Sequence, residues 1–516
     1  MKHINSLLLS AISFMFLSCT ASKKAGTKDD GKIVVQFVQV NDVYEIAPIA
    51  AGKVGGMARV ATIKKDLLQK NPNTYLLMAG DFLSPSVFNS LKYEGKRIRG
   101  RQMVETMNAA GMDIAVFGNH EFDIAEDELQ SRINESAFSW ISSNSFHQTN
   151  SGVLPFVKTT STGAENIPTT YIMPVKDEDG TTARIGFIGI NLPFNKAPYV
   201  SYTDPLSTAV TLYNQIKDSC DAVIAITHQL IADDIKLAKT LPGLAAIIGG
   251  HEHDMRYEKV GDVIISKAHA NARSAYIVQL KLNKRKNTHQ LKTRLQIIDD
   301  KIELDSATNE VVQKWSAIAT ANYSSIGFDA NKIILVDGEP LDAREANIRR
   351  TKTNFSTLIV KAMEAAAPEA AIAIVNSGSI RLDDVLYPPV SQYDILRSLP
   401  FGGAIAEVDM KGSLLLQILE VGRKNVGIGG FLHYSEAVSY DAASAAWTLK
   451  DEPIDTGKIY RVALTDFLLS GGEANMNFLA KTNPAIVHAY PQETFIRDAR
   501  SDIRLAIVRY MEQLNK

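Results

Sequence analysis

The chain has 516 residues, of which 45% are hydrophobic and 22% charged, and its formal net charge at pH 7 is -2. This length exceeds what one hydrophobic core usually serves, so the sequence predicts two or more domains. The near-neutral charge argues against a broad polyanion-binding face, and we therefore expect no nucleic-acid polymer as a partner.

The N-terminus is typical of an exported lipoprotein. Lys2 and His3 precede the run "INSLLLSAISFMFLS", which is too short to span a bilayer comfortably and is typical of a secretory signal. Cys19 follows in a context that resembles a bacterial lipobox, which predicts its lipidation; a plain signal peptide or a buried thiol remains the alternative. We expect a chain anchored by its lipid in the bacterial cell envelope, at the periplasmic face of the outer membrane or at the cell surface.

Short apolar runs rich in β-branched residues then alternate with amphipathic stretches as far as about residue 300. Runs of this kind, bounded by Gly, Asn or Asp, are typical of buried strands in an α/β domain. The stretch Ala58–Lys70 predicts an amphipathic helix between two of them. The predicted strands are "KIVVQFVQV", "NTYLLMAG", "DIAVFG", "ARIGFIGI", "DAVIAIT", "LAAIIGG" and "DVIISK".

A helix and a turn follow within 309–330 and predict a connector between two domains. The remaining strand and helix patterns predict a second α/β domain. We expect a signal peptide over 1–19, a flexible tether over 20–31, a first domain over 32–305, a helical connector over 306–330 and a second domain over 331–516.

Five of the predicted strands end on side chains that can hold a metal ion or a phosphate. In open α/β sheets such side chains gather at the carboxyl ends of the strands. Each one alone could be an ordinary turn or a hydrogen-bonded histidine, but their combination predicts a metal site. Carboxylate, amide and imidazole ligands suit Zn, Mn, Fe or Co better than Ca. The residues are Asp42, Asp81, Asn119, His120, His228, His251 and His253.

The order Asp-x-Tyr, Gly-Asp, Gly-Asn-His-Glu, His, Gly-His-Glu-His resembles the calcineurin-like metallophosphoesterases. The chain resembles, more closely, the secreted 5′-nucleotidase/UDP-sugar hydrolase family. This resemblance implies an α/β fold, with a four-layer αββα metallophosphoesterase domain followed by a second α/β substrate-binding domain. It also implies two divalent ions, the first held by Asp42 and His253, the second by Asn119, His228 and His251, and both bridged by Asp81.

The same resemblance implies a two-metal phosphohydrolase, in which a hydroxide held by the ions attacks phosphorus. His120 would face the scissile phosphate, Asp123 would orient its imidazole, and Asn119 completes the catalytic set.

Tyr44 stands where the family pattern has a histidine ligand of the first metal. A phenol has an ordinary pKa of about 10 and must lose its proton to bind a metal well. Three outcomes stay open: a phenolate ligand that favours iron, a tyrosine that leaves water in its place, or a weak or empty first site.

The second half resembles the nucleotide-binding domain of the same family in the stretches "NSGSIR", "LPFGG" and "DFLLSGGE". By this resemblance two phenylalanines would sandwich a base, although both could instead be core residues. An amide would bond to the base, a glutamate would accept from the ribose hydroxyls, and arginines would address a ribose, phosphate or carboxylate. The two phenylalanines are Phe401 and Phe467, the amide is Asn376 and the glutamate is Glu473. The arginines are Arg381 and Arg349, and Arg350 is a competing candidate for the place of Arg349.

The sequence therefore predicts an exported 5′-nucleotidase that releases phosphate from nucleoside 5′-phosphates. A phosphodiesterase or UDP-sugar/nucleotide pyrophosphohydrolase on the same scaffold is the first alternative. A nucleotide-binding lipoprotein without turnover is the second, motivated by Tyr44. The oligomeric state is not predicted.

Overall fold

The computed structural model describes residues 29–194 and 197–514. The predicted signal peptide and the predicted lipidation of Cys19 lie outside these residues. Within them, no helix is both long and apolar enough to cross a membrane.

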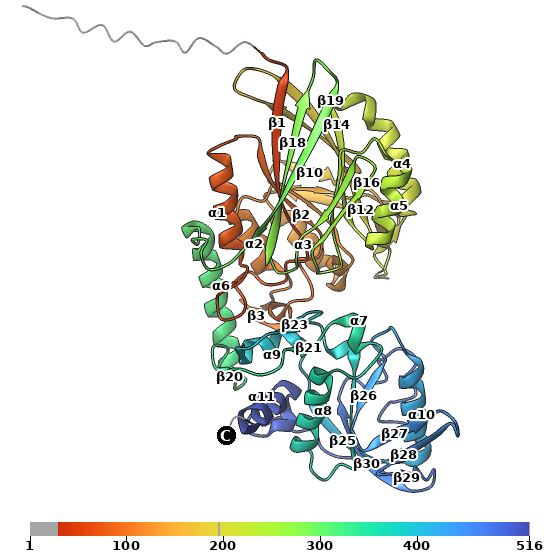
Figure 1. Cartoon of the computed structure of the whole chain (residues 1–516). Helices are drawn as coiled ribbons and strands as arrows, with labels where there is room; N and C mark the ends of the chain where they lie inside the picture. The colour runs from red at the N-terminus through yellow and green to blue at the C-terminus, as the bar shows by residue number, and fades with distance from the viewer. Residues whose placement is uncertain (1–28, 195–196, 515–516) are drawn as a thin grey trace, which may run out of the picture.

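The first domain is built on two six-stranded sheets that pack face to face (Figure 1). Apolar side chains from both sheets, such as Phe37, Phe187 and Ile224, form the core between them. One sheet runs, in spatial order, β19 (Thr288–Ile297), β18 (Ser274–Asn283), β1 (Lys32–Val40), β2 (Thr74–Ala79), β5 (Ile114–Val116) and β6 (Ser139–Ile141). The other runs β11 (Thr170–Lys176), β12 (Thr182–Asn191), β14 (Ala222–His228), β15 (Ala246–Gly250), β17 (Val263–Lys267) and β16 (Arg256–Val260).

Helices cover the outer faces of both sheets, which gives the predicted αββα layers. The first sheet packs against α1 (Met57–Leu68), α2 (Arg101–Ala109) and α3 (Glu126–Glu135), and the second against α4 (Pro205–Ile216) and α5 (Ile231–Thr240). The α/β prediction is confirmed, and the helix predicted over Ala58–Lys70 is α1. Small strands complete this domain: β3 (Lys92–Tyr93), β4 (Lys96–Arg97), β7 (Ser145–Thr149), β8 (Gly152–Leu154), β9 (Val157–Thr160), β10 (Gly163–Asn166) and β13 (Val200–Tyr202).

The helix α6 (Ser306–Ser325) leads from the first domain to the second. Asp305 caps it by accepting a hydrogen bond from the amide of Thr308 at 2.9 Å. Trp315, fully buried, donates to the Glu105 carboxylate of α2 at 2.9 Å. The connector is therefore fixed to the first domain along its length.

The second domain surrounds a five-stranded mixed sheet. The sheet runs β26 (Leu432–Tyr434), β22 (Ile372–Asn376), β30 (Ile459–Thr465), β25 (Ile405–Lys411) and β31 (Ile486–Ala489). Its helices are α7 (Glu345–Ile348), α8 (Asn354–Ala366), α9 (Gln392–Ser398), α10 (Gly412–Lys424) and α11 (Ile503–Leu514). Its smaller strands are β20 (Ile333–Leu335), β21 (Leu341–Asp342), β23 (Val385–Leu386), β24 (Val390–Ser391), β27 (Val438–Asp441), β28 (Ala446–Leu449) and β29 (Glu452–Pro453).

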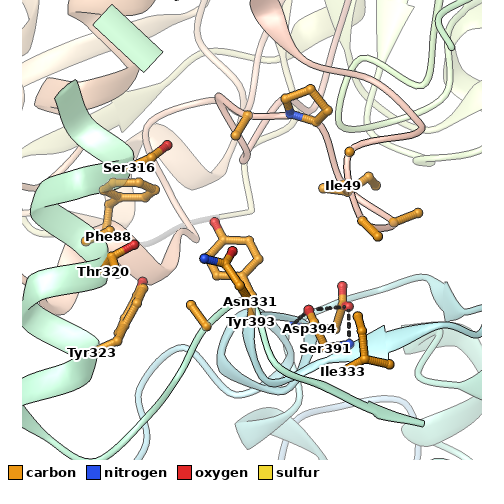
Figure 2. Close-up of a pocket in the computed structure, with 17 residues that line it drawn as sticks. Ile49, Phe88, Ser316, Thr320, Tyr323, Asn331, Ile333, Ser391, Tyr393 and Asp394 are labelled. Atoms are coloured by element: carbon orange, nitrogen blue, oxygen red, sulfur yellow. Dashed lines mark hydrogen bonds between the residues drawn. The ribbon is translucent and has the colours of Figure 1, made fainter. Parts of the chain in front are cut away.

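Both domains line a cavity of about 290 Å³ beside α6 (Figure 2). At its edge the hydroxyl of Tyr393, from the second domain, donates a hydrogen bond to the buried carboxylate of Glu45. Burial raises the pKa of Glu45 to about 7. The loop that follows β1 is thereby tied to the second domain directly after Tyr44.

Candidate metal centre

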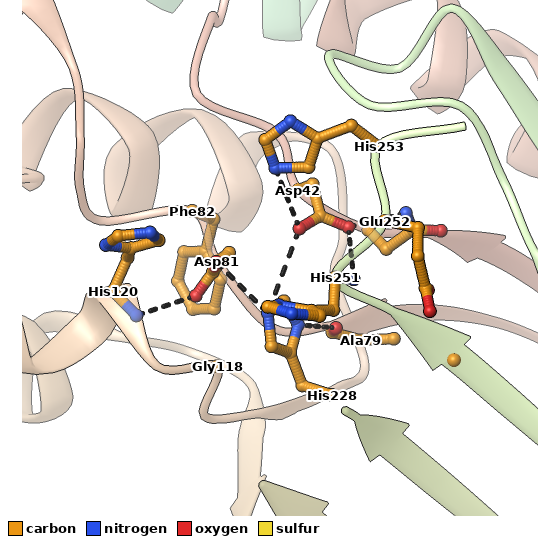
Figure 3. A network of polar contacts seen from close by, with 12 residues as sticks. Asp42, Ala79, Asp81, Phe82, Gly118, His120, His228, His251, Glu252 and His253 are labelled. Atoms are coloured by element: carbon orange, nitrogen blue, oxygen red, sulfur yellow. Dashed lines mark hydrogen bonds and ion pairs between the residues drawn. The ribbon is translucent and has the colours of Figure 1, made fainter. Parts of the chain in front are cut away.

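The predicted ligands converge at one edge of the two sheets (Figure 3). Strands β1, β2 and β5 are parallel neighbours in one sheet, and β14 and β15 are parallel neighbours in the other. Within each sheet the carboxyl ends therefore point the same way, and the contacts of His228 with Asp81 and Asp42 bring the two sets of ends together. Asp42 follows β1, Asp81 follows β2, Asn119 follows β5, His228 ends β14, and His251 and His253 follow β15.

Asp42, Asp81 and His228 form a buried group whose donor atoms all lie within 4.8 Å of one another. His228 Nε2 is 3.0 Å from Asp81 Oδ2 and 3.8 Å from Asp42 Oδ1. Within the described residues Asp42 Oδ1 and Asn119 Oδ1 are buried and make no hydrogen bond, while His228 Nε2 faces the carboxylate of Asp81. Buried oxygens are costly to leave unpaired, and a cation would satisfy both of them and replace the pairing of His228 with Asp81, so these residues fit a metal ion.

The charges of this group also fit a bound cation. Burial alone would lower the pKa of His228, but the carboxylates of Asp81 and Asp42 raise this pKa to about 10. Burial and the neighbouring charge of His228 lower the pKa of His251 to about 3. A proton on His228 thus supplies the positive charge that a bound metal would supply.

Tyr44 lies inside this group. Its hydroxyl donates to Asp81 Oδ2 at 3.2 Å and lies 3.0 Å from His253 Nε2, which in turn is 3.5 Å from Asp42 Oδ1. Metal–ligand bonds of about 2.0–2.2 Å place neighbouring ligand atoms about 3.3–3.6 Å apart, close to these separations. Burial and the two carboxylates raise the pKa of Tyr44 well above its ordinary value, so only a cation could displace the phenol proton.

The predicted catalytic pair is formed beside the group. His120 Nδ1 lies 2.7 Å from Asp123 Oδ2, and the amide of His120 donates to Asp81 Oδ1 at 2.8 Å. Burial opposes a charge on the ring, but Asp123 and Asp81 outweigh it and raise the pKa of His120. The side-chain oxygen of Asn119, the residue before His120, is buried and makes no hydrogen bond with any described residue.

Four of the predicted ligands have a left-handed backbone, which L-amino acids other than glycine rarely adopt. Their φ angles are 52° for Asp42, 57° for Asp81, 97° for His251 and 58° for His253. Strain of this kind clusters at functional sites.

Glu121 organises the site and was not among the predicted residues. Its buried carboxylate accepts hydrogen bonds from the amides of Asp81, Phe82, Leu83 and Gly118, at 2.6 to 3.0 Å. Burial and the charge of Asp81 raise the pKa of Glu121 to about 7, and the amides oppose this by favouring the carboxylate. The signal was present in the sequence as the glutamate of "GNHE", directly after the predicted catalytic histidine.

Lys267 was also missed. Its buried ammonium lies 2.6 Å from Glu252 Oε2 and 2.8 Å from Asp234 Oδ2, and it donates to the carbonyl of Gln229 at 2.6 Å. Because Glu252 stands between two predicted ligands, Lys267 anchors the turn that carries them. The one sequence signal for this role was the position of Lys267, a charged residue at the end of the apolar run "DVIISK".

The second domain reaches this centre through one short loop. Arg381 Nη2 lies 3.5 Å from His120 Nδ1, and Asp383 Oδ2 lies 3.2 Å from His253 Nδ1. A cavity of about 410 Å³ is lined by Asp123, Arg381 and Phe401 among others. A second, of about 350 Å³, includes His251, Asp383, Arg349 and Arg350.

The predicted nucleotide-reading residues are only partly arranged for a ligand. Asn376 donates to Glu473 Oε2 at 2.6 Å, so the two side chains engage each other. Phe401 is 67% exposed and Phe467 is 46% exposed, so the alternative that they are core residues is wrong. Arg349 pairs with Glu345, and burial together with the charge of Arg381 lowers the pKa of Arg349 to about 10.

Comparisons with known proteins agree with this layout. Residues 35–255 match the calcineurin-like phosphoesterase family, and residues 330–481 match the 5′-nucleotidase C-terminal domain. The chain is 24% identical to the 5′-nucleotidase of Bos taurus over 476 residues, which covers 81% of this chain and 78% of the relative. It is 25% identical to the snake venom 5′-nucleotidase of Crotalus adamanteus over 509 residues, covering 86% and 82%. The structure of the 5′-nucleotidase precursor from Thermus thermophilus has a TM-score of 0.67 at 20% identity, covering 93% of this chain and 97% of that chain.

The fold and the cluster at the strand ends define a metal-dependent phosphoester hydrolase with a calcineurin-like catalytic domain. The second domain specifies it further. The chain belongs to the 5′-nucleotidase family, in which such a catalytic domain is followed by a 5′-nucleotidase C-terminal domain.

Replacing Glu121 with Gln should destabilise the protein. The amide group would face four backbone N–H donors, and each buried polar group left unsatisfied costs about 1–3 kcal/mol. The melting temperature, followed by circular dichroism, should therefore fall. Glu126→Gln is the matched control, because its side chain is 57% exposed. Equal melting temperatures for the two variants would contradict the role given to Glu121.

Proposed function

We propose that the chain is an exported 5′-nucleotidase that releases phosphate from nucleoside 5′-phosphates. The observation that carries the proposal is the meeting of Arg381 with His120 at 3.5 Å, beside a cavity that Asp123 and Phe401 also line. The carboxylate of a histidine–carboxylate pair suited to phosphoryl chemistry and an exposed aromatic ring suited to a base thus line one cavity. The 5′-nucleotidase relatives support the same substrate class.

We assign the predicted ligands to two divalent ions of Zn, Mn, Fe or Co. Asp42, Tyr44 and His253 would hold the first ion, and iron is favoured there if Tyr44 binds as a phenolate. Asp81 would bridge the ions, and Asn119, His228 and His251 would hold the second. When bound, the ions would neutralise phosphoryl charge and lower the pKa of a water molecule.

The chain's own residues would do the rest. His120, kept protonated by Asp123, donates a hydrogen bond to a phosphoryl or leaving-group oxygen as charge develops there. Arg381 pairs with anionic oxygens of the substrate. The exposed rings of Phe401 and Phe467 stack on the base, for about 1–3 kcal/mol each.

The remaining side chains of the second domain would read the nucleoside. Asn376 bonds to the base and Glu473 to the ribose, after their mutual hydrogen bond is exchanged for bonds to substrate. Arg349 assists at a ribose, phosphate or carboxylate, with Arg350 next to it in the same cavity.

Export and anchoring form part of the proposal and rest on the N-terminal sequence. The apolar run before Cys19 and the polar residues 20–31 after it support a lipid anchor with a flexible tether. The membrane would be contacted through that anchor only, and catalysis would take place in the cell envelope. The domain boundaries at 32–305, 306–330 and 331–516 are proposed together with it.

A substrate panel tests this function. The metal-reconstituted protein is assayed for phosphate release from AMP, for cleavage of bis-p-nitrophenyl phosphate and for cleavage of UDP-glucose. Phosphate release from AMP supports the proposal. Cleavage of the diester or UDP-glucose alone would assign a phosphodiesterase or pyrophosphohydrolase, and AMP binding without turnover would assign a binding protein.

Replacing His120 with Ala should lower kcat for AMP by about 10²- to 10⁴-fold, the usual contribution of a positioned general acid. Asn119→Ala should lower turnover by a comparable amount through the second ion. Steady-state kinetics on protein with a verified metal content measures both effects. Full activity of the His120 variant would overturn the assigned site.

Replacing Phe401 with Ala should act on binding. Loss of one stacking partner costs about 1–3 kcal/mol, which is about a 5- to 150-fold increase in KM with kcat little changed. Phe495→Ala is the matched control, since that ring is 61% exposed and lines none of the three cavities described above. An equal KM for the two variants would remove Phe401 from the substrate site.

Tyr44→Phe removes one hydroxyl and keeps the ring. If that oxygen is a ligand, the metal content measured by mass spectrometry should fall from about two ions per chain toward one. Tyr44→His should restore it, because histidine is the ligand in the family pattern. Two ions retained in the Phe variant would mean that the phenol is not a ligand.

A further inference from the structure

We propose that Asp383 of the second domain positions His253 of the first, so that binding of the first metal ion and closure of the two domains favour each other. The inference rests on the ligand assignment proposed above. By this proposal Asp383, which lies outside the catalytic domain, supports a ligand of the first metal ion.

The geometry around the His253 ring carries the first step. Asp383 Oδ2 lies 3.2 Å from Nδ1. The opposite nitrogen, Nε2, faces Asp42 Oδ1 at 3.5 Å and the Tyr44 hydroxyl at 3.0 Å. A carboxylate that accepts the Nδ1 proton fixes the tautomer whose Nε2 lone pair is free for a metal, and it makes that nitrogen a better donor.

Asp383 is itself held in place for this contact. Its Oδ1 accepts a hydrogen bond from the amide of Glu345 at 2.6 Å, and its backbone is left-handed, with φ 46°. The carboxylate is therefore aimed by its own domain. It does not depend on His253 for its orientation.

The neighbouring residue binds the same part of the first domain. Asp384 pairs with Arg273 at 3.2 Å, and Arg273 donates to the backbone carbonyl of His253 at 3.3 Å. With Arg381 beside His120, one short loop of the second domain contacts a predicted ligand, the arginine that bonds to the backbone of that ligand, and the predicted catalytic histidine.

Linkage follows from the position of Asp383 in the chain. Since the carboxylate belongs to the second domain, His253 has this partner only while the domains are closed as in this structure. If Asp383 raises the affinity of the closed chain for the metal by some factor, then metal binding shifts the equilibrium between open and closed domains toward the closed form by the same factor. This follows because the coupling between two equilibria is reciprocal. Removing a hydrogen-bond partner of a ligand typically weakens metal binding by about 10- to 100-fold.

The first experiment titrates Mn²⁺ into the metal-free full chain by isothermal titration calorimetry. Asp383→Asn keeps the size of the side chain but loses the charge, and it should weaken one of two binding steps by about 10- to 100-fold. Asp383→Glu should restore much of that affinity, which a purely structural role would not predict. Asp409→Asn is the matched control, because it breaks a pair with Arg461 inside the second domain and leaves both the His253 ring and the contacts between the domains in place.

Two results would overturn the positioning role: unchanged affinity in Asp383→Asn, or an equal loss in Asp409→Asn. Failure of the proposed function would look different, because the wild-type chain would then bind no Mn²⁺ or hydrolyse no phosphoester.

The second experiment tests the linkage by small-angle X-ray scattering. Saturating Mn²⁺ should reduce the radius of gyration of the wild-type chain and have a smaller effect on Asp383→Asn. A wild-type chain that binds Mn²⁺ with no change in its radius would refute the coupling.

Discussion

The carboxylate of Asp81 is the interaction on which the site depends. It receives the ring nitrogen of His228 from the other sheet, the hydroxyl of Tyr44 and the backbone amide of His120. Its own amide is held by Glu121. Because these partners come from the ends of three different strands, β1, β5 and β14, one buried charge joins the two sheets at the edge where the predicted ligands meet. Any cation placed there would replace the proton of His228 as the balancing charge.

Much of the fold could be predicted because its physics is local. A strand buried on both faces must be apolar, and in a parallel arrangement the polar residues directly after such strands share an edge. The runs ending before Asp42, Asp81 and Asn119 obey this rule, and α1 was predicted to within two residues of either end. The histidines of β14 and β15 were recognised for the same reason.

What could not be predicted depends on contacts between distant segments. The glutamate of "GNHE" marked Glu121 as a candidate, but the sequence does not show that its carboxylate meets four amide donors, three of which come from the turn after β2. Lys267 and Asp234 are far apart in the chain and meet only through the packing of β17 on α5. Asp383 lies in a loop whose sequence, "RLDD", gives no sign that it reaches a histidine of the other domain. The periodicity of hydrophobic residues predicts which face of a helix or strand is buried. It does not predict which distant side chains come into contact.

The left-handed conformation of four predicted ligands has a consequence for engineering. Each such residue is strained by about 1–3 kcal/mol, whereas whole domains are stable by only about 5–15 kcal/mol. A stabilising redesign that scored the metal-free chain would therefore rank these positions among the first to replace, with glycine the favoured substitute. Such a redesign would raise the melting temperature by removing the side chains that are predicted to bind the metal ions. Thermostable variants of this scaffold should accordingly be selected with the ion present, so that the strain and its benefit are scored together.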